Sequence, residues 1–167
     1  KNVLAMPMVA TLGGAGELAA PSIVFPSYNH TDRGLESCAG SMPATYYGVL
    51  RIIDGRTCEQ QATIASPAII PTASVAIADL GGDPTPEIVA PRMDGGLVAF
   101  TLQPTGWQVM WQTASRLADD LCDWAGPSIH DLDDDGKPEI IFYGAVFDAA
   151  GNTLDDSRAG VVDSIGT

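Results

Sequence analysis

The sequence predicts an all-β fold made of about three similar units of roughly 50 residues. Two ten-residue segments, DLGGDPTPEI at 79–88 and DLDDDGKPEI at 131–140, are identical at six of ten positions and lie 52 residues apart. Gly48, Gly96 and Gly144 each begin an apolar run and recur every 48 residues. Repetition with such a period is typical of repeat architectures. Short β-branched and aromatic runs between glycines and prolines favour strands over helices.

The first unit is the most divergent copy. Its loop, TLGGAG at 11–16, is followed by the apolar run PSIVF at 21–25 and by the run that begins at Gly48. The acidic side chains of the other two loops are missing here. We therefore expect this loop to bind no metal and to be held by turn geometry alone.

In the second and third units, apolar runs alternate with turn residues, which predicts strands directly. The expected strands are residues 74–78, 87–90, 97–102 and 109–113 in the second unit, and 140–143 and 145–147 in the third. Segment 114–124 carries Leu117 and Leu121 at helical spacing and is followed by Gly126 and Pro127. It is expected to be a loop with one or two helical turns.

Four antiparallel strands in a repeat of this length predict the blade of a β-propeller. The expected units are 1–60, a degenerate first blade with a loop insertion, 61–115, a second blade, and 116–167, a third blade with the more acidic loop. A propeller closes with roughly four to eight blades. We therefore expect the chain to be a fragment of a larger propeller or to be completed by other chains.

The charge balance restricts the class of partner. The 167 residues include 8 Lys and Arg against 21 Asp and Glu, which gives a net charge of −13. This sign argues against a nucleic-acid partner, because DNA and RNA binding requires cations that neutralise phosphates. The sequence contains no run of 18 apolar residues, so no membrane span is predicted.

The strongest chemical signal is the acidic loop at 131–139. Its alternating oxygens would converge on one point, and hard oxygen ligands at this density suit Ca²⁺, which takes about six to eight of them. The expected ligands are the carboxylates of Asp131, Asp133, Asp135 and Glu139 and the carbonyl of Lys137. The alternative is a solvated acidic turn, since aspartate favours turns through bonds to its own backbone.

The loop at 79–87 is a weaker candidate for the same chemistry. The candidate calcium ligands in this loop are Asp79, Asp83, Thr85 and Glu87. Gly81 replaces the second carboxylate, and Pro84 replaces the loop glycine. Because proline fixes φ at about −65°, this loop is not expected to follow the path of the loop at 131–139.

The acidic loop between two strands of a repeat resembles the FG-GAP/VCBS repeat, the calcium-bearing blade of integrin α-subunit propellers and of many secreted bacterial proteins. Residues 131–139 match every position of that family's pattern D-x-D-x-D-G-x-x-(D/E). Segments 74–102 and 126–151 look like successive blades, and 3–57 looks like a degenerate one. The resemblance implies an extracellular or cell-surface module that acts in adhesion or assembly and binds a protein or carbohydrate ligand.

Two other functions fit the same sequence. The chain is alternatively a non-catalytic or partial propeller of a secreted polysaccharide-active enzyme, a lyase or hydrolase, or a subunit of a surface filament or layer. No convergent catalytic residues stand out, so no catalytic activity is assigned. Trp107 and Trp124, which lie near turns, are candidates to stack on sugar rings, whereas Trp111 is expected in the core.

Three cysteines allow at most one internal disulfide. Cys38 and Cys58 are the candidate pair, since they would close a polar loop in an oxidising compartment. Cys122 is then left over or pairs outside the chain. Segments 28–44 and 114–125 are insertions relative to a minimal blade, and we expect binding surfaces on them.

Overall fold

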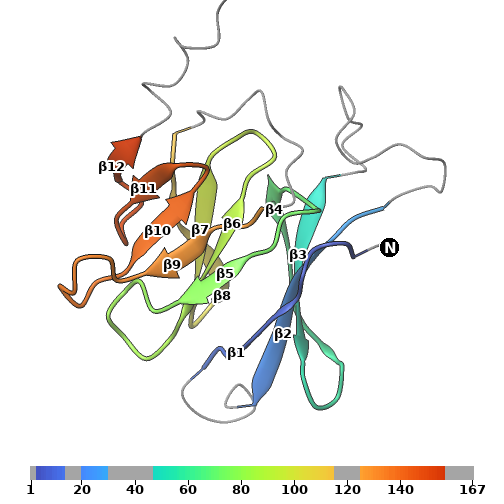
Figure 1. Cartoon of the computed structure of the whole chain (residues 1–167). Coiled ribbons are helices and arrows are strands. Elements are labelled where there is room, and N and C mark those ends of the chain that lie inside the picture. Colours follow the sequence, from blue (N-terminus) through green and yellow to red (C-terminus); the bar gives the residue numbers. More distant parts are fainter. Residues whose placement is uncertain (1–2, 14–19, 30–46, 115–124, 157–167) are drawn as a thin grey trace, which may run out of the picture.

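The all-β prediction is confirmed by the computed structural model, which describes residues 3–13, 20–29, 47–114 and 125–156. These residues form twelve strands and no helix. The strands make three four-stranded antiparallel sheets, and in each sheet the strands are neighbours in the order in which they occur in the chain (Figure 1). Each unit is therefore a simple up-and-down meander, the layout expected from the repeats.

The first sheet extends further along the chain than the sequence indicated. Its strands are β1 (Met8–Thr11), β2 (Pro21–Ser27), β3 (Gly48–Asp54) and β4 (Gln60–Ile69). The unit boundary was expected at residue 60, but β4 pairs with β3 and so belongs to the first sheet. The first sheet ends at Ile69 because this long strand is the fourth strand of its own meander, not the first strand of the next.

The second and third sheets contain all the strands expected for them. Their strands are β5 (Ala76–Ala78), β6 (Glu87–Pro91), β7 (Leu97–Gln103), β8 (Gly106–Gln112), β9 (Ser128–His130), β10 (Glu139–Phe142), β11 (Ala145–Phe147) and β12 (Thr153–Asp156). The two acidic loops occupy the same place in each sheet, between the first and second strands. The sequence repeat is therefore a structural repeat.

Two of the recurring glycines, Gly48 and Gly96, lie where neighbouring chain approaches closely. Gly48 begins the third strand of the first sheet, and Gly96 and Gly144 directly precede the third strands of the other two. A Cβ on Gly48 would lie 2.4 Å from the carbonyl oxygen of Ile69, and one on Gly96 would lie 2.5 Å from Oγ1 of Thr113. At both positions the end of the fourth strand comes so near that only glycine fits.

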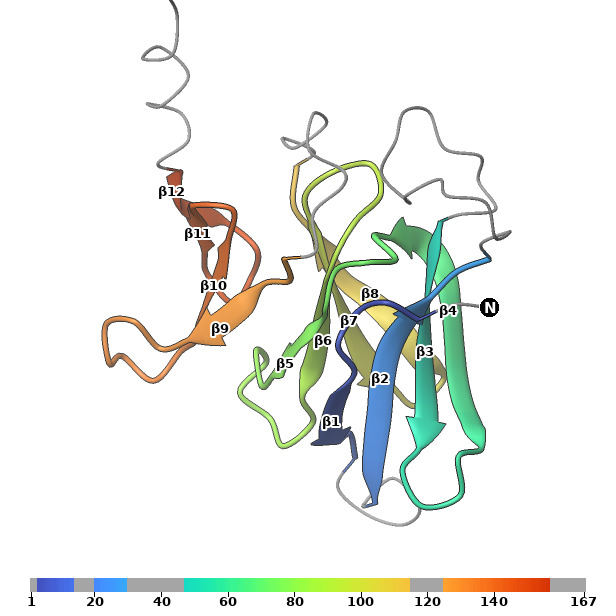
Figure 2. The same ribbon diagram turned by 45° about the vertical axis from the view of Figure 1, so that its right-hand side comes forward.

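The sheets stack face to face, with an apolar layer between each neighbouring pair (Figure 2). Side chains of the middle sheet alternate between the layers: Ile88 and Phe100 belong to the first layer, and Val89 and Leu97 to the second. All five residues of β6 are buried. The centre of the middle sheet, β6 and the first half of β7, is therefore covered on both faces, which explains why these segments read as continuous apolar runs.

The first strands of the sheets lie side by side, β1 against β5 and β5 against β9. The three sheets of the described chain follow one another without closing into a ring (Figures 1 and 2). Among the described residues, no helix is long and apolar enough to cross a membrane.

Candidate metal site

The acidic loop 131–139 brings three carboxylates together at the end of the third sheet. Oxygens of Asp131, Asp133 and Glu139 all lie within 4.8 Å of one another. Glu139 is the first residue of β10 and pairs with His130, the last residue of β9. The glutamate is only 9% exposed, whereas both aspartates are exposed. The cluster therefore has a buried base on the sheet and an open rim in solvent.

Backbone N–H groups of the loop fix the direction of the aspartates. Asp131 accepts hydrogen bonds from the N–H of Asp135 (3.2 Å) and of Gly136 (2.9 Å), and Asp133 accepts a second contact from Asp135 N–H (3.2 Å). Asp134 and Gly136 adopt positive φ of 60° and 86°. These two left-handed residues coil the loop around its own carboxylates, a conformation that Asp and Gly adopt more readily than most residues.

The other two predicted ligands of this loop lie outside the cluster. Asp135 accepts the N–H of Lys137 (2.8 Å) through Oδ1, and its Oδ2 lies 3.9 Å from the Lys137 Nζ. The lysine side chain is 78% exposed and that of the aspartate 46%. An ion pair as open to water as this one contributes little to stability. Ligation by Asp135 and by the Lys137 carbonyl stays a prediction.

The glutamate of the second loop is fully used by the protein itself. Glu87 is 1% exposed. Its Oε2 accepts the N–H groups of Leu80 (2.8 Å) and Gly81 (3.2 Å), and its Oε1 accepts the hydroxyl of Thr101 (3.0 Å). A carboxylate with three such donors is stable in a buried place without a cation.

The remaining polar residues of the second loop close a turn. Asp79 accepts the N–H groups of Gly82 (2.7 Å) and Asp83 (3.1 Å), and Asp83 accepts the N–H of Thr85 (2.7 Å). Within the described residues, these carboxylates do not form a cluster with Glu87 of the kind found at 131–139. The geometry therefore gives the weaker second site no support.

Within the described residues, Glu139 accepts one hydrogen bond where Glu87 accepts three, because the counterparts of the Gly81 N–H and of the Thr101 hydroxyl are missing. Both accept the N–H of the residue seven positions earlier, which for Glu139 is Leu132 (2.7 Å). Strand pairing makes Asp148 the counterpart of Thr101. In the second sheet, Ile88 pairs with Phe100, and Thr101 follows Phe100. In the third sheet, Ile140 pairs with Phe147, and Asp148 follows Phe147. A carboxylate cannot donate. Within the described residues, the second oxygen of Glu139 therefore has no hydrogen-bond donor and is open to a cation.

Asp148 is a turn residue. It accepts the N–H groups of Ala150 (2.9 Å) and Asn152 (2.8 Å) and the side-chain amide of Asn152 (2.9 Å). Burial raises the pKa of Asp148, but the bonds from Asn152, Ala150 and Gly151 together outweigh it, so the pKa lies below its ordinary value of 3.8. The side chain therefore stays ionised and holds the turn between β11 and β12.

The role of Thr101 does not follow from the loop pattern in the sequence. This residue lies 14 positions from Glu87 and belongs to the third strand of the sheet, outside the loop pattern. Strand pairing alone brings the hydroxyl to the carboxylate. The signal is the residue that follows Phe100 and Phe147: it is a threonine in the second sheet and an aspartate in the third, but the two positions correspond only once the strand register is known.

Several other predicted features fall outside the described residues. They include Cys38, Cys122, Trp124 and most of segments 28–44 and 114–125. Cys58 is exposed and forms no disulfide with any residue that the structure describes. The pairing of Cys38 with Cys58 therefore stays a prediction. Trp111 is partly buried against the second apolar layer, as expected for a core residue.

Comparison with known proteins supports the fold and goes no further. No family model matches the chain, and no curated protein matches it. An exotype rhamnogalacturonan lyase, YesX, superposes with a TM-score of 0.58 at 19% identity over 89% of this chain and 29% of its own. The rhamnogalacturonan lyase YesW gives 0.59 at 19% identity over 90% and 30%. The chain therefore has the fold of a part of these lyase chains, and it spans under a third of their length.

Proposed function

We propose that the chain is a calcium-binding structural module, a run of three β-propeller blades in which Ca²⁺ at 131–139 fixes the loop between β9 and β10. The observation that carries this proposal is the contrast between the two glutamates. Glu139 keeps an open oxygen beside Asp131 and Asp133, whereas protein donors satisfy Glu87 completely. One loop is built around a cation, and the other replaces the cation with Thr101.

The ligand type favours calcium over other ions. The clustered groups are all carboxylates, and hard oxygen ligands suit Ca²⁺ or Mg²⁺ better than zinc or copper. Calcium tolerates the irregular geometry of an exposed loop, whereas Mg²⁺ demands a near-ideal octahedron and keeps several waters. Asp135 and the Lys137 carbonyl would complete the shell. The ion would relieve the repulsion among the three clustered carboxylates and stiffen the loop, without any chemical step.

The blade assignment is supported by the way the sheets stack and by one pair of equivalent leucines. Leu80 is 8% exposed, packed in the layer that the third sheet covers, while Leu132 at the same loop position is 53% exposed. A further sheet on the third would cover Leu132 as the third sheet covers Leu80. We take that neighbour to be another blade, from a longer chain or from a partner chain.

A calorimetric titration of the metal-stripped chain with CaCl₂ tests the metal site. We expect one site per chain, weakened at least about tenfold by Asp133→Asn. Asp134→Asn is the matched control, since it changes the same charge in the same loop at a side chain outside the cluster. Equal weakening by both variants would mean that calcium senses only the general acidity of the loop, and would reject the assigned ligands.

Two glutamate variants separate the loops. Glu139→Gln removes one negative charge at the open carboxylate and should abolish measurable binding. Glu87→Gln changes the equivalent residue of the second loop and should leave the calcium affinity unchanged. Two binding sites in the unaltered chain, one lost in Glu87→Gln, would show that the second loop also binds metal and would refute the role given to Thr101.

A second candidate, that the chain is part of an extracellular polysaccharide-active protein, is favoured by the likeness to the lyases over 89–90% of the chain. Rhamnogalacturonan carries carboxylates, so a protein of net charge −13 is repelled by it unless a cation bridges the two. Affinity electrophoresis through gels containing rhamnogalacturonan should show retardation in calcium and none in EDTA. Unchanged mobility at every calcium concentration would contradict this candidate and leave the structural module standing.

A further inference from the structure

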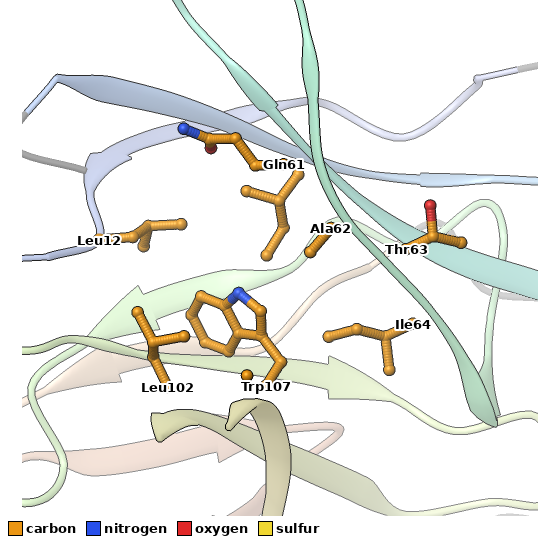
Figure 3. A pocket seen from close by; sticks show the side chains of 9 residues that line it. Leu12, Gln61, Ala62, Thr63, Ile64, Leu102 and Trp107 are labelled. Carbon is orange, nitrogen blue, oxygen red and sulfur yellow. The ribbon is translucent and has the colours of Figure 1, made fainter. Parts of the chain in front are cut away.

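The outer strands of the first two sheets border an open pocket that the metal loop does not use. The pocket has a volume of about 390 Å³ and lies between β4 of the first sheet and β8 of the second (Figure 3). Its walls are mainly apolar and include Ile52, Ala62, Ile64, Leu102 and Trp107. Sites for small organic molecules have volumes of roughly 300–1,000 Å³, mostly apolar walls and a few polar groups.

Trp107 is the aromatic side of the pocket and brings a polar atom to it. Figure 3 shows its indole between Leu102 and the side chains of β4, with the ring nitrogen on the side of Ala62. In the described residues the Nε1–H of Trp107 has no acceptor. Trp111, on the same strand, donates its Nε1–H to the carbonyl of Ala149 at 2.9 Å. The two tryptophans of β8 therefore differ: one is bonded between sheets, and the other presents a free donor to a pocket.

The Gln61 amide lies at the rim, with its nitrogen turned away from Trp107 (Figure 3). The side-chain oxygen of Gln61 accepts the hydroxyl of the buried Ser22 at 2.7 Å, which fixes the amide. Its NH₂ group has no acceptor within the described part of the chain. None of the residues lining the pocket is charged. A fitting ligand is therefore uncharged, offers acceptor oxygens and has an apolar face.

We propose that this pocket binds one neutral pyranose ring. The C–H face of the ring would lie on the Trp107 indole, and a ring hydroxyl oxygen would accept the Trp107 Nε1–H. A purely apolar ligand would leave that donor without water or acceptor, which costs free energy. A uronic acid would bring a negative charge to an uncharged pocket in a protein of net charge −13. The proposal is independent of the calcium loop.

The test is a titration of the ¹⁵N-labelled full chain with methyl β-D-glucopyranoside, followed by NMR at the indole N–H signals. The Trp107 signal is identified by its loss in Trp107→Phe. We expect a saturable shift of that signal with a dissociation constant in the millimolar range, as befits a ligand of about a dozen heavy atoms. Cyclohexanol and galacturonate are titrated in parallel and should shift the signal less at equal concentration.

Two variants probe the pocket without depending on the same side chain. Ala62→Leu fills the pocket from β4, retains the Trp107 signal and should abolish its shift by glucoside. Trp107→Phe keeps an aromatic face but removes the donor, and should weaken glucoside binding, measured by saturation-transfer NMR, about fivefold. Gln108→Ala is the matched control on the same strand, because Gln108 is exposed and does not line the pocket.

Absence of any glucoside-induced shift would overturn the proposal. An equal or larger response to cyclohexanol would also overturn it, since the pocket would then be a general apolar gap between splayed sheets. Tighter binding of galacturonate would refute the neutral ligand class. A shift that persists unchanged in Ala62→Leu would place the sugar elsewhere and would refute the site.

Discussion

Replacing Gly151 by alanine should loosen the contact between the second and third sheets. Gly151 lies in the turn between β11 and β12 with a φ of +80°, and a Cβ there would come within 2.7 Å of ring carbons of Trp111 on β8. The indole of Trp111 also donates to the carbonyl of Ala149 in the same turn. The turn therefore rests on the tryptophan at two points, and an added methyl group would push it away.

The expected loss has two parts. Placing a non-glycine residue at this positive φ costs about 1–2 kcal/mol. Forcing a methyl group against the packed indole costs about 1–3 kcal/mol more. Gly151→Ala should therefore lower the free energy of unfolding by about 2–5 kcal/mol. Gly82→Ala is the matched control, because Gly82 has a φ of +74° and a Cβ added there would meet nothing within 4 Å. It should show only the first part.

Urea unfolding followed by far-UV circular dichroism measures both variants under the same conditions. The difference between the two losses reports the contact with Trp111, since the backbone cost is shared. Gly151→Ala combined with Trp111→Leu should lose less than the sum of the single changes, because the side chain that the methyl group strikes is gone. Equal losses for Gly151→Ala and Gly82→Ala would refute the docking of this turn on the second sheet.

Three further outcomes follow from the same contacts. Thr101→Val should lower the free energy of unfolding by about 1–2 kcal/mol, because it removes a donor to buried Glu87. Calorimetry should find the calcium affinity of this variant unchanged, and a loss of calcium binding would contradict the division of roles between the loops. Calcium at about 100 times its dissociation constant should add about 2.7 kcal/mol to stability, seen as a rise in the thermal midpoint that Glu139→Gln eliminates. The N–H groups of Arg56 and Thr57 hold the pKa of Asp54 below 3.8, as turn bonds do for Asp148. The pKa of each aspartate is lower in the folded than in the unfolded chain, so the stabilisation is present above about pH 4 and is lost as the pH falls through the folded-state pKa. Urea unfolding midpoints that stay constant between pH 6 and 3 would contradict this prediction.

Much of the local structure was predictable because its causes are local. Glycines at 96 and 144 precede the third strands, and the acidic segments at 79–88 and 131–140 form the loops before the second strands. Positive φ, turn chemistry and alternation of apolar residues act over a few positions, and a repeat shows them several times. The boundary at residue 60 was misplaced because β4, which carries Pro67 near its end, shows little of this patterning.

The sequence alone determined that this is an all-β repeat protein of strong negative charge, with one loop rich enough in carboxylates to hold a cation. Only the tertiary structure decided which glutamate keeps a free oxygen, because the hydroxyl that satisfies Glu87 comes from another strand, 14 residues away. It also decided that the centre of the middle sheet is buried on both faces, and that Trp107 faces a pocket while Trp111 is bonded to the next sheet. These features depend on which strands pair and which faces meet. Strand pairing and face-to-face packing are both determined by side chains that lie far apart in the sequence, so no local sequence pattern predicts them.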